Sequence, residues 1–351
     1  MILAQVAAAA RSAAALPMTL AVAAVDVDAD LDAQPVPGTG GEPAGGHGTG
    51  YGGTHGTDYG AGHGAGHAVG PGRGSVGVDD TVVLPVASAS KLLLLAEVAR
   101  RLDAGELRAD AVVPIADEDV TGGTGLLRRL SRTGAGTGPG ATAGAGRDAC
   151  GWTVEDLAWL TASVSDNTAT NALLRTVGLP ATERLARDLG LTDLTLHDRV
   201  RDVRGPGVPP VFATGTARDL ARLVALAVRG DLVSPGASAR LLEWMRSNTD
   251  HGLVPALVQH DPYAECFPDP LPGGLLVANK TGTDTGVRAD AGVLIGARRV
   301  AYAVIAHWDV TLGPSTERAA VHAIREVGRA LAAGAQRGEP ATCALLRQPG
   351  G

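Results

Sequence analysis

The chain of 351 residues contains almost no lysine. Lysine and arginine together number 30, and only two of these are lysines, Lys91 and Lys280. Arginine stays protonated in proteins, whereas a buried lysine can lose its proton and act as a base. Two isolated lysines in an arginine-rich chain therefore indicate a local chemical need at each position.

Other scarcities exclude whole classes of protein. The formal net charge of −7, with so little lysine, argues against a surface for nucleic acid or anionic membrane. The three cysteines, Cys150, Cys266 and Cys343, are far apart and predict neither a disulfide framework nor a metal-binding spacing. No run approaches the roughly 18 apolar residues that a membrane span needs. Aromatic residues make up only 3%, so the core must consist of alanine, leucine and valine.

The first residues do not resemble an export signal. Residues 1–15 are rich in alanine, but they lack a basic start and Arg11 interrupts them, so we expect an ordinary helix there. If the sequence begins at the true start, we expect a cytoplasmic protein. If the true start lies upstream, we expect a secreted one.

Two segments have the composition of unstructured chain. Residues 35–74 repeat glycine, threonine and histidine with almost no aliphatic residues, which predicts a disordered insertion. Four histidines lie in it: His47, His55, His63 and His67. They leave a metal site open as an alternative, but we favour a solvated loop because no cysteine or carboxylate cluster accompanies them. Residues 336–351 predict a flexible tail.

The remaining pattern predicts strands at both ends of the chain and helices between them. We expect an antiparallel sheet covered by the terminal helices, with an all-α lobe inserted at about 88–211, which is an α/β (α+β) fold. The α/β lobe then comprises about 1–87 and 212–335, and residues 1–34 and 75–335 form a single catalytic domain. The expected strands are 19–27, 75–86, 275–280, 291–295 and 300–308.

The helix predicted over 88–102 begins with a hydroxyl and an amine on one face. Ser88 and Lys91 are three residues apart and are therefore neighbours on a helix. Four leucines follow Lys91, so the helix is expected to be buried on most sides. Burial and nearby cations lower the pKa of a lysine, which favours Lys91 as the base that takes the proton of Ser88.

Two further motifs follow in order, Ser165-Asp166-Asn167 and Lys280-Thr281-Gly282. With Ser88-x-x-Lys91, this set resembles the class A β-lactamases and their penicillin-recognising relatives. The resemblance covers nearly the whole chain apart from the insertion and the tail. It implies the β-lactamase and transpeptidase type of fold, with a five-stranded antiparallel sheet.

The resemblance also implies a role for each motif. Ser88 would be acylated, with Lys91 as the base, and backbone N–H groups of Ser88 and Thr283 would form the oxyanion hole. Ser165, positioned by Lys280, would relay a proton to the leaving nitrogen. The substrate-binding residues would be Asn167, Thr281, Gly282, Thr283 and Arg288, although a surface salt bridge is an equal alternative for Arg288. Asp166 is expected to fix its loop rather than to touch substrate.

One part of the family pattern is missing. Efficient hydrolytic members carry a glutamate in the loop after the second motif, and it activates the water that releases the acyl group. Here Asp198 and Arg199 match that loop, but Arg201 stands in the place of the glutamate and Asp202 follows it. We therefore expect acylation of Ser88 and slow release, unless Asp202 or another group recruits the water.

The sequence leaves three functions open. The first is a β-lactamase-like serine hydrolase that acts on a β-lactam or a related amide or ester. The second is a penicillin-binding-protein-like D-Ala peptidase or transpeptidase, which would have to be exported. The third is a non-enzymatic module that accepts an acyl group or only binds. In each case we expect a monomer that needs no cofactor or metal and binds neither nucleic acid nor membrane.

Overall fold

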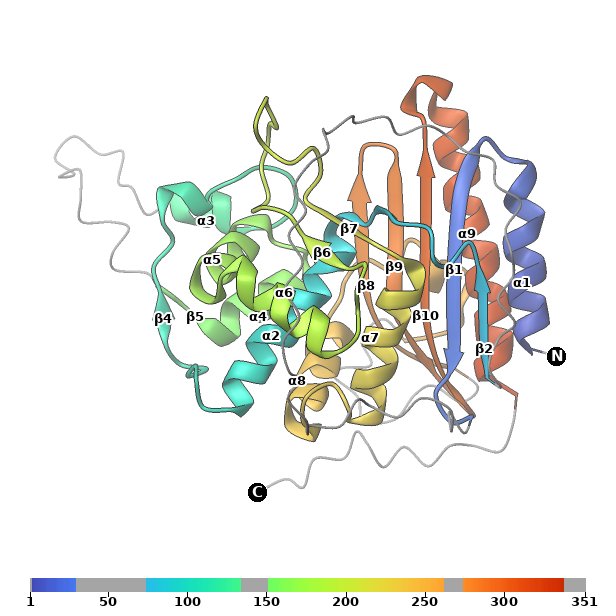
Figure 1. The fold of residues 1–351 in the computed structure, drawn as a ribbon, viewed down its shortest axis with the longest axis horizontal. Coiled ribbons are helices and arrows are strands. Elements are labelled where there is room, and N and C mark those ends of the chain that lie inside the picture. The colour runs from blue at the N-terminus through green and yellow to red at the C-terminus, as the bar shows by residue number, and fades with distance from the viewer. Residues whose placement is uncertain (1, 30–73, 134–150, 262–273, 338–351) are drawn as a thin grey trace, which may run out of the picture.

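The computed structural model describes residues 2–29, 74–133, 151–261 and 274–337. Five strands form one antiparallel sheet in the order β2-β1-β10-β9-β8, so strands from both ends of the chain lie side by side (Figure 1). The predicted sheet is thereby confirmed. Its strands are β1 (Met18–Asp26), β2 (Ser75–Val78), β8 (Leu276–Asp284), β9 (Val287–Ile295) and β10 (Arg299–Trp308).

Helices cover both faces of this sheet. On one face lie α1 (Ile2–Ser12) and α9 (Pro314–Ala335), which share a core with Tyr302 of the sheet (Figure 1). On the other face α7 (Ala217–Arg229) packs against β1 and β10. A sheet that is buried on both faces favours near-continuous apolar strands, which explains the runs of alanine and valine in β1 and β10.

The helical lobe lies beside β8, on the side of the sheet away from β2 (Figure 1). Three of its helices, α4 (Val154–Ser163), α5 (Asn167–Val177) and α8 (Pro235–Arg246), begin where a polar side chain accepts from a free backbone N–H group. Thr153 and Asp156 cap α4 reciprocally, as their spacing indicates. The other helices are α2 (Lys91–Asp103), α3 (Leu127–Thr133) and α6 (Leu179–Asp188). Short strands β3 (Leu84–Pro85), β6 (Thr195–Leu196) and β7 (Ala213–Gly215) form a small sheet, and β4 (Val112–Val113) pairs with β5 (Trp152–Thr153).

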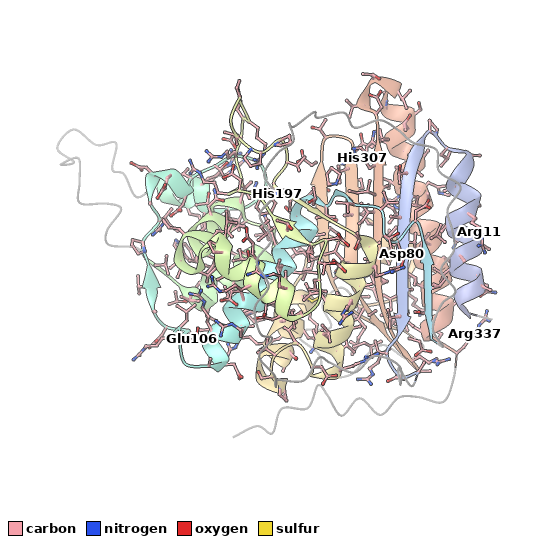
Figure 2. All side chains as sticks on the ribbon, in the orientation of Figure 1. Arg11, Asp80, Glu106, His197, His307 and Arg337 are labelled. Carbon is pink, nitrogen blue, oxygen red and sulfur yellow. The ribbon has the colours of Figure 1, made fainter. Side chains whose placement is uncertain are left out.

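The single strand predicted over 75–86 is wrong. β2 ends at Val78, and β3 belongs to the small sheet. Between them Asp79 adopts a left-handed conformation with φ of 49°, which ends the extended chain. Asp80 (Figure 2) pairs with Arg218 of α7 at 2.9 Å and holds this turn against the helix.

Three further boundaries near the motifs differ from the prediction by three residues or more. Residues Ala87–Ser90 form a 3-10 turn, so the helix predicted from 88 begins at Lys91. The strand predicted over 275–280 continues to Asp284, and its partner begins at Val287 rather than at 291. The third motif therefore lies inside β8, because pairing with β9 extends both strands to the tight connection at residues 285–286.

Several predictions fall outside the described residues. They include the insertion over 35–74 apart from its last residue, its four histidines, the three cysteines and the tail from residue 338 onward. Among the described helices, none is long and apolar enough to cross a membrane.

We predict that the buried leucines of α2 dominate the stability of the helical lobe. Leu94 is fully buried, so Leu94→Ala should lower the free energy of unfolding by about 2–5 kcal/mol through lost burial and a residual cavity. Leu312→Ala is the control, because that side chain is 47% exposed and should change stability by less than about 0.5 kcal/mol. Urea titration of both variants measures the difference, and equal losses would contradict the assignment.

Candidate active site

A cavity of about 730 Å³ lies between the helical lobe and β8. This volume is in the usual range of small-molecule sites. Five residues of the predicted site contribute to its wall: Ser88, Ser165, Asn167, Thr281 and Thr283. The other lining residues are Ala87, Gly122, Gly123, Thr124, Arg128, Ser163, Val164, Val200, Arg201, Asp202, Phe212, Asn248, Thr249, Asp250 and Asp284.

Ser88 reaches the cavity from a strained turn. The preceding residue, Ala87, is buried and left-handed, with φ of 45°, a conformation that costs energy for any residue with a Cβ atom. Ser90 Oγ donates to the carbonyl oxygen of Ala87 at 2.7 Å and holds the turn closed. Ser88 is thereby half-buried at the cavity wall, just before α2 begins.

Gly282 allows β8 to approach this turn. A Cβ atom on Gly282 would lie 2.5 Å from the carbonyl oxygen of Val86 and 2.8 Å from the backbone nitrogen of Ala89. Both neighbours are backbone atoms that cannot move aside, so a side chain at residue 282 would push the strand away from Ser88. The glycine of the third motif is therefore explained by close packing.

The Lys91 amine is fully buried and surrounded by oxygen atoms of the second motif. Its Nζ lies 2.8 Å from Asn167 Oδ1, 2.9 Å from the carbonyl oxygen of Ser165 and 3.2 Å from Ser165 Oγ. Burial, and then the charge of Lys280, hold the pKa of Lys91 well below its usual range. A neutral amine has two N–H groups, which match the two shorter contacts, and a lone pair that remains to accept a hydroxyl proton.

The second motif is held by its own hydrogen bonds. Asp166 accepts from the backbone nitrogens of Leu127 at 2.8 Å and Ala169 at 2.9 Å, so it caps α5 and fixes the loop as expected. Ser165 is left-handed, with φ of 54°. Asn167 donates from Nδ2 to the carbonyl oxygen of Gly122 at 2.8 Å, so both ends of its amide have protein partners, and its contact with substrate stays a prediction.

Lys280 is fully buried in β8 and donates to the carbonyl oxygen of Thr281 at 3.0 Å. Burial lowers the pKa of Lys280 to about 8, against the opposing effect of the carboxylates of Asp250 and Asp290. Thr281 Oγ1 donates to Asp250 Oδ2 at 2.7 Å. The resemblance assigned the positioning of Ser165 to Lys280, but the amine that contacts Ser165 Oγ here is that of Lys91.

Arg288 lies opposite Thr283 in the β8–β9 register, but its side chain is engaged elsewhere. It forms an ion pair with Glu317 of α9, and its guanidinium lies 5.6 Å from the centre of the Trp308 ring. Arg288 is not among the residues that line the described cavity. These contacts favour the salt bridge that the sequence left as the alternative.

The segment after the second motif brings Arg201 and Asp202 to the cavity. The Arg201 guanidinium forms an ion pair with Asp198. Asp202 Oδ1 accepts from Thr121 Oγ1 at 2.8 Å and from the backbone nitrogen of Gly122, so it ties this segment to the loop opposite.

Side chains beyond the motifs support this segment. Asn171 of α5 bonds to both backbone groups of Val200, at 2.8 and 3.0 Å. His197 (Figure 2) bonds through Nε2 to Thr214 Oγ1 at 2.8 Å, and burial lowers its pKa. Asn171 was not predicted from the sequence, and neither were Asp250 and Asp290 beside β8. No local motif contains them, because their roles depend on contacts between distant segments.

No group of three or more metal-ligating side chains occurs in the described part of the chain. The motif residues bring hydroxyl, amine and amide groups to the site, and the carboxylates of Asp202 and Asp250 lie in its wall. Side-chain and backbone groups of this kind can activate a nucleophile and stabilise an oxyanion.

Solved structures share this fold. A β-lactamase from Sphaerobacter thermophilus aligns with a TM-score of 0.64 at 24% identity, over 93% of this chain and 95% of that one. A protein named PBP-A aligns with a TM-score of 0.65 at 19% identity, over 94% and 95%. These likenesses show the β-lactamase and transpeptidase type of fold, as the sequence predicted.

Sequence comparisons agree. A β-lactamase from Streptomyces fradiae is 32% identical over 217 residues, which are 60% of this chain and 61% of that protein. A β-lactamase regulatory protein, BlaB, from Streptomyces cacaoi is 30% identical over 130 residues, 36% of each. The chain thus matches about three fifths of the length of the first relative and less of the second. A model described as the β-lactamase enzyme family matches residues 68–334, and the chain belongs to that family.

Proposed function

We propose that this chain is a serine enzyme of the class A β-lactamase type, in which Ser88 opens a β-lactam ring and becomes acylated. The observation that carries the proposal is the buried Lys91 amine beside Ser165 and Asn167, next to a cavity that Ser88 lines. With its pKa lowered, this amine can serve as a general base.

The proton path of acylation follows from these contacts. Lys91 takes the hydroxyl proton as Ser88 Oγ attacks the carbonyl carbon and forms the C–O bond. When the C–N bond breaks, the leaving nitrogen receives a proton from Ser165 Oγ, which is replenished by Lys91 at 3.2 Å. The amine ends neutral, and the proton has moved from Ser88 to the nitrogen. The backbone N–H groups of Ser88 and Thr283 would stabilise the oxyanion.

The same cavity suggests how a substrate carboxylate would be held. Thr281 lines the wall, and the amine of Lys280 donates to the carbonyl oxygen of Thr281. Because the pKa of Lys280 is about 8, this binding charge would be present at neutral pH and fade above it. Penicillins and related compounds carry such a carboxylate.

We further propose that the acyl-enzyme is released slowly. Arginine does not deprotonate in proteins, and Arg201 is in addition paired with Asp198, so it offers no base for the attacking water. Asp202 is committed through Oδ1 to the opposite loop. A variant of PBP-A, which shares this fold, has been solved as an acyl-enzyme complex with penicillin G, which supports the idea that such a scaffold retains its acyl group.

Slow release also favours a second candidate function. A protein that keeps its acyl group could report the presence of a β-lactam rather than destroy it. The resemblance to the regulatory protein BlaB over part of the chain supports this alternative. The lifetime of the acyl group separates the two candidates, because a reporter needs a long lifetime and a resistance enzyme a short one. A D-Ala peptidase would instead consume a peptide ending in D-Ala-D-Ala.

We predict that penicillin forms a stable covalent adduct with Ser88. Intact-protein mass spectrometry during incubation with benzylpenicillin should show one added drug mass that persists after free drug is removed. Ser88→Ala should show none. An adduct that vanishes as the drug is consumed would make the protein an efficient hydrolase, and no adduct at all would contradict the proposed substrate.

We also predict that a carboxylate at residue 201 restores release. Arg201→Glu places a base at the wall of the cavity that Ser88 lines, and general-base assistance of this kind contributes roughly 10²-fold or more. The lifetime of the adduct, measured by mass, should shorten by about that factor. Arg201→Gln is the matched control, since it removes the arginine without adding a base. Equal lifetimes in the two variants would rule out the missing base as the cause.

A further inference from the structure

A buried carboxyl group lies behind the active site and has no role in the mechanism above. Asp290 of β9 is fully buried and lies opposite Thr281 in the β8–β9 register. Three donors surround it: the backbone nitrogen of Val254 at 3.0 Å from Oδ2, and Asn279 Nδ2 at 3.0 Å and the Tyr302 hydroxyl at 3.1 Å from Oδ1. Such a set of donors stabilises the charged form of a buried carboxylate.

Hydrogen bonds lead from this carboxyl group to the cavity. Asn279 Oδ1 accepts from Asn248 Nδ2 at 2.9 Å, and the same Nδ2 lies 3.0 Å from the carbonyl oxygen of Asp250. Asp250 Oδ2 in turn accepts from Thr281 Oγ1 at 2.7 Å. Asn248, Asp250 and Thr281 all line the cavity, so Asp290 anchors one of its walls from inside the protein.

Asp290 and Lys280 lie on neighbouring strands, one register position apart, and their side chains point to opposite faces of the sheet. Side chains alternate along a strand, so Lys280 lies on the same face as Gly282, toward the Ser88 turn. Asp290 lies on the opposite face with Thr281. Both charged groups are fully buried, and water screens their interaction poorly at such sites. The carboxylates of Asp250 and, after it, Asp290 accordingly oppose the effect of burial on the pKa of Lys280.

The other charged and titratable groups around Asp290 come from three elements. Burial raises the pKa of Asp290 to about 7, and the like charge of Asp250, which follows α8 in the chain, acts in the same direction. The three hydrogen bonds to Asp290 act in the opposite direction. The Tyr302 phenol of β10 keeps its proton, because burial raises its pKa well above the usual value. Arg325 of α9 donates to the carbonyl oxygen of Gly252 at 2.9 Å, on the segment next to Asp250. His251, on that segment, has its pKa lowered by burial.

We propose that Asp290 is a positioning residue for the active site: from behind the sheet its carboxylate holds the proton on Lys280 and anchors the wall formed by Asn248 and Asp250. This inference rests on the proposed function, in which Lys280 binds the substrate carboxylate. On this proposal, the preference for substrates with a carboxylate depends on Asp290, a side chain that does not contact the substrate.

The first test measures the titration of the Lys280 amine directly and needs no substrate. Because the chain has only two lysines, protein labelled with ¹³C at lysine Cε gives two lysine signals, and Lys91→Arg identifies that of Lys280. In Asp290→Asn the titration of the Lys280 signal should move to lower pH, because an opposing negative charge has been removed. An unchanged Lys280 titration in the folded variant would overturn the proposal.

The second test measures how the charge of Lys280 affects the reaction with a substrate that carries a carboxylate. Benzylpenicillin and its methyl ester differ only in the carboxylate that Lys280 would bind, so the ratio of their acylation rates reports the charge of Lys280. If the titration moves by about one pH unit, Asp290→Asn should lower the acid-over-ester preference about fivefold at about pH 8 and less than about twofold at about pH 6.5. A loss that affects both substrates equally at every pH would overturn the proposal. If neither compound acylates the wild type, the proposed function fails, while the lysine titration still stands.

Two further variants separate charge from packing. Val304 is buried opposite Asp290 in the β9–β10 register, so Val304→Ala loosens the same place without removing the carboxylate. The Lys280 titration should stay unchanged there, and a shift equal to that of Asp290→Asn would refute the electrostatic explanation. If Asp290→Asn does not fold, Tyr302→Phe removes one donor and keeps the ring. It should shift the Lys280 titration in the same direction by a smaller amount, and no shift would overturn the proposal.

Discussion

The active site depends on the close contact between β8 and the turn that carries Ser88. Gly282 permits this contact, because any Cβ atom there would collide with backbone atoms of the turn. The contact brings the third motif to the cavity and places two buried amines near each other. Each amine has lost its hydration, and the charge of Lys280 disfavours a proton on Lys91. Packing of backbone against backbone thus creates the electrostatic conditions that a lysine base requires.

The two lysines differ in their neighbours, and this difference separates their roles. Lys91 is in hydrogen-bond contact with an amide oxygen, a carbonyl oxygen and a hydroxyl group, and the carboxylate of Asp166 only partly opposes the effects of burial and of Lys280 on its pKa. Lys280 has Asp250 at the cavity wall and Asp290 behind the sheet. These neighbours fit the proposed roles, in which Lys91 would act as a neutral base and Lys280 as a cation, although both are fully buried.

The sequence predicted the motif residues, because each motif is local and its order along the chain is informative, and the structure brings five residues of the predicted site to one cavity. It also indicated the antiparallel sheet, since strands at both ends of the chain must pair to bury their apolar residues. It did not identify Asp290, whose role depends on the register that places it beside Asn279 and Tyr302. For Arg288, the partner Glu317 comes from a helix 29 residues further on, a contact that spacing alone does not reveal. The break at Asp79 was missed because alternating valines continue on both sides of it.

The burial of both lysines has a consequence for the surface of the protein. A β-lactam is a reactive acyl donor toward any accessible primary amine, and exposed lysines are the usual targets of such adventitious acylation. The remaining strongly basic side chains of the sequence are arginines, whose guanidinium groups stay protonated and do not attack. A protein that meets acylating compounds repeatedly would thus collect little stray modification, and an acyl group found on it would report chemistry at the serine rather than at its surface.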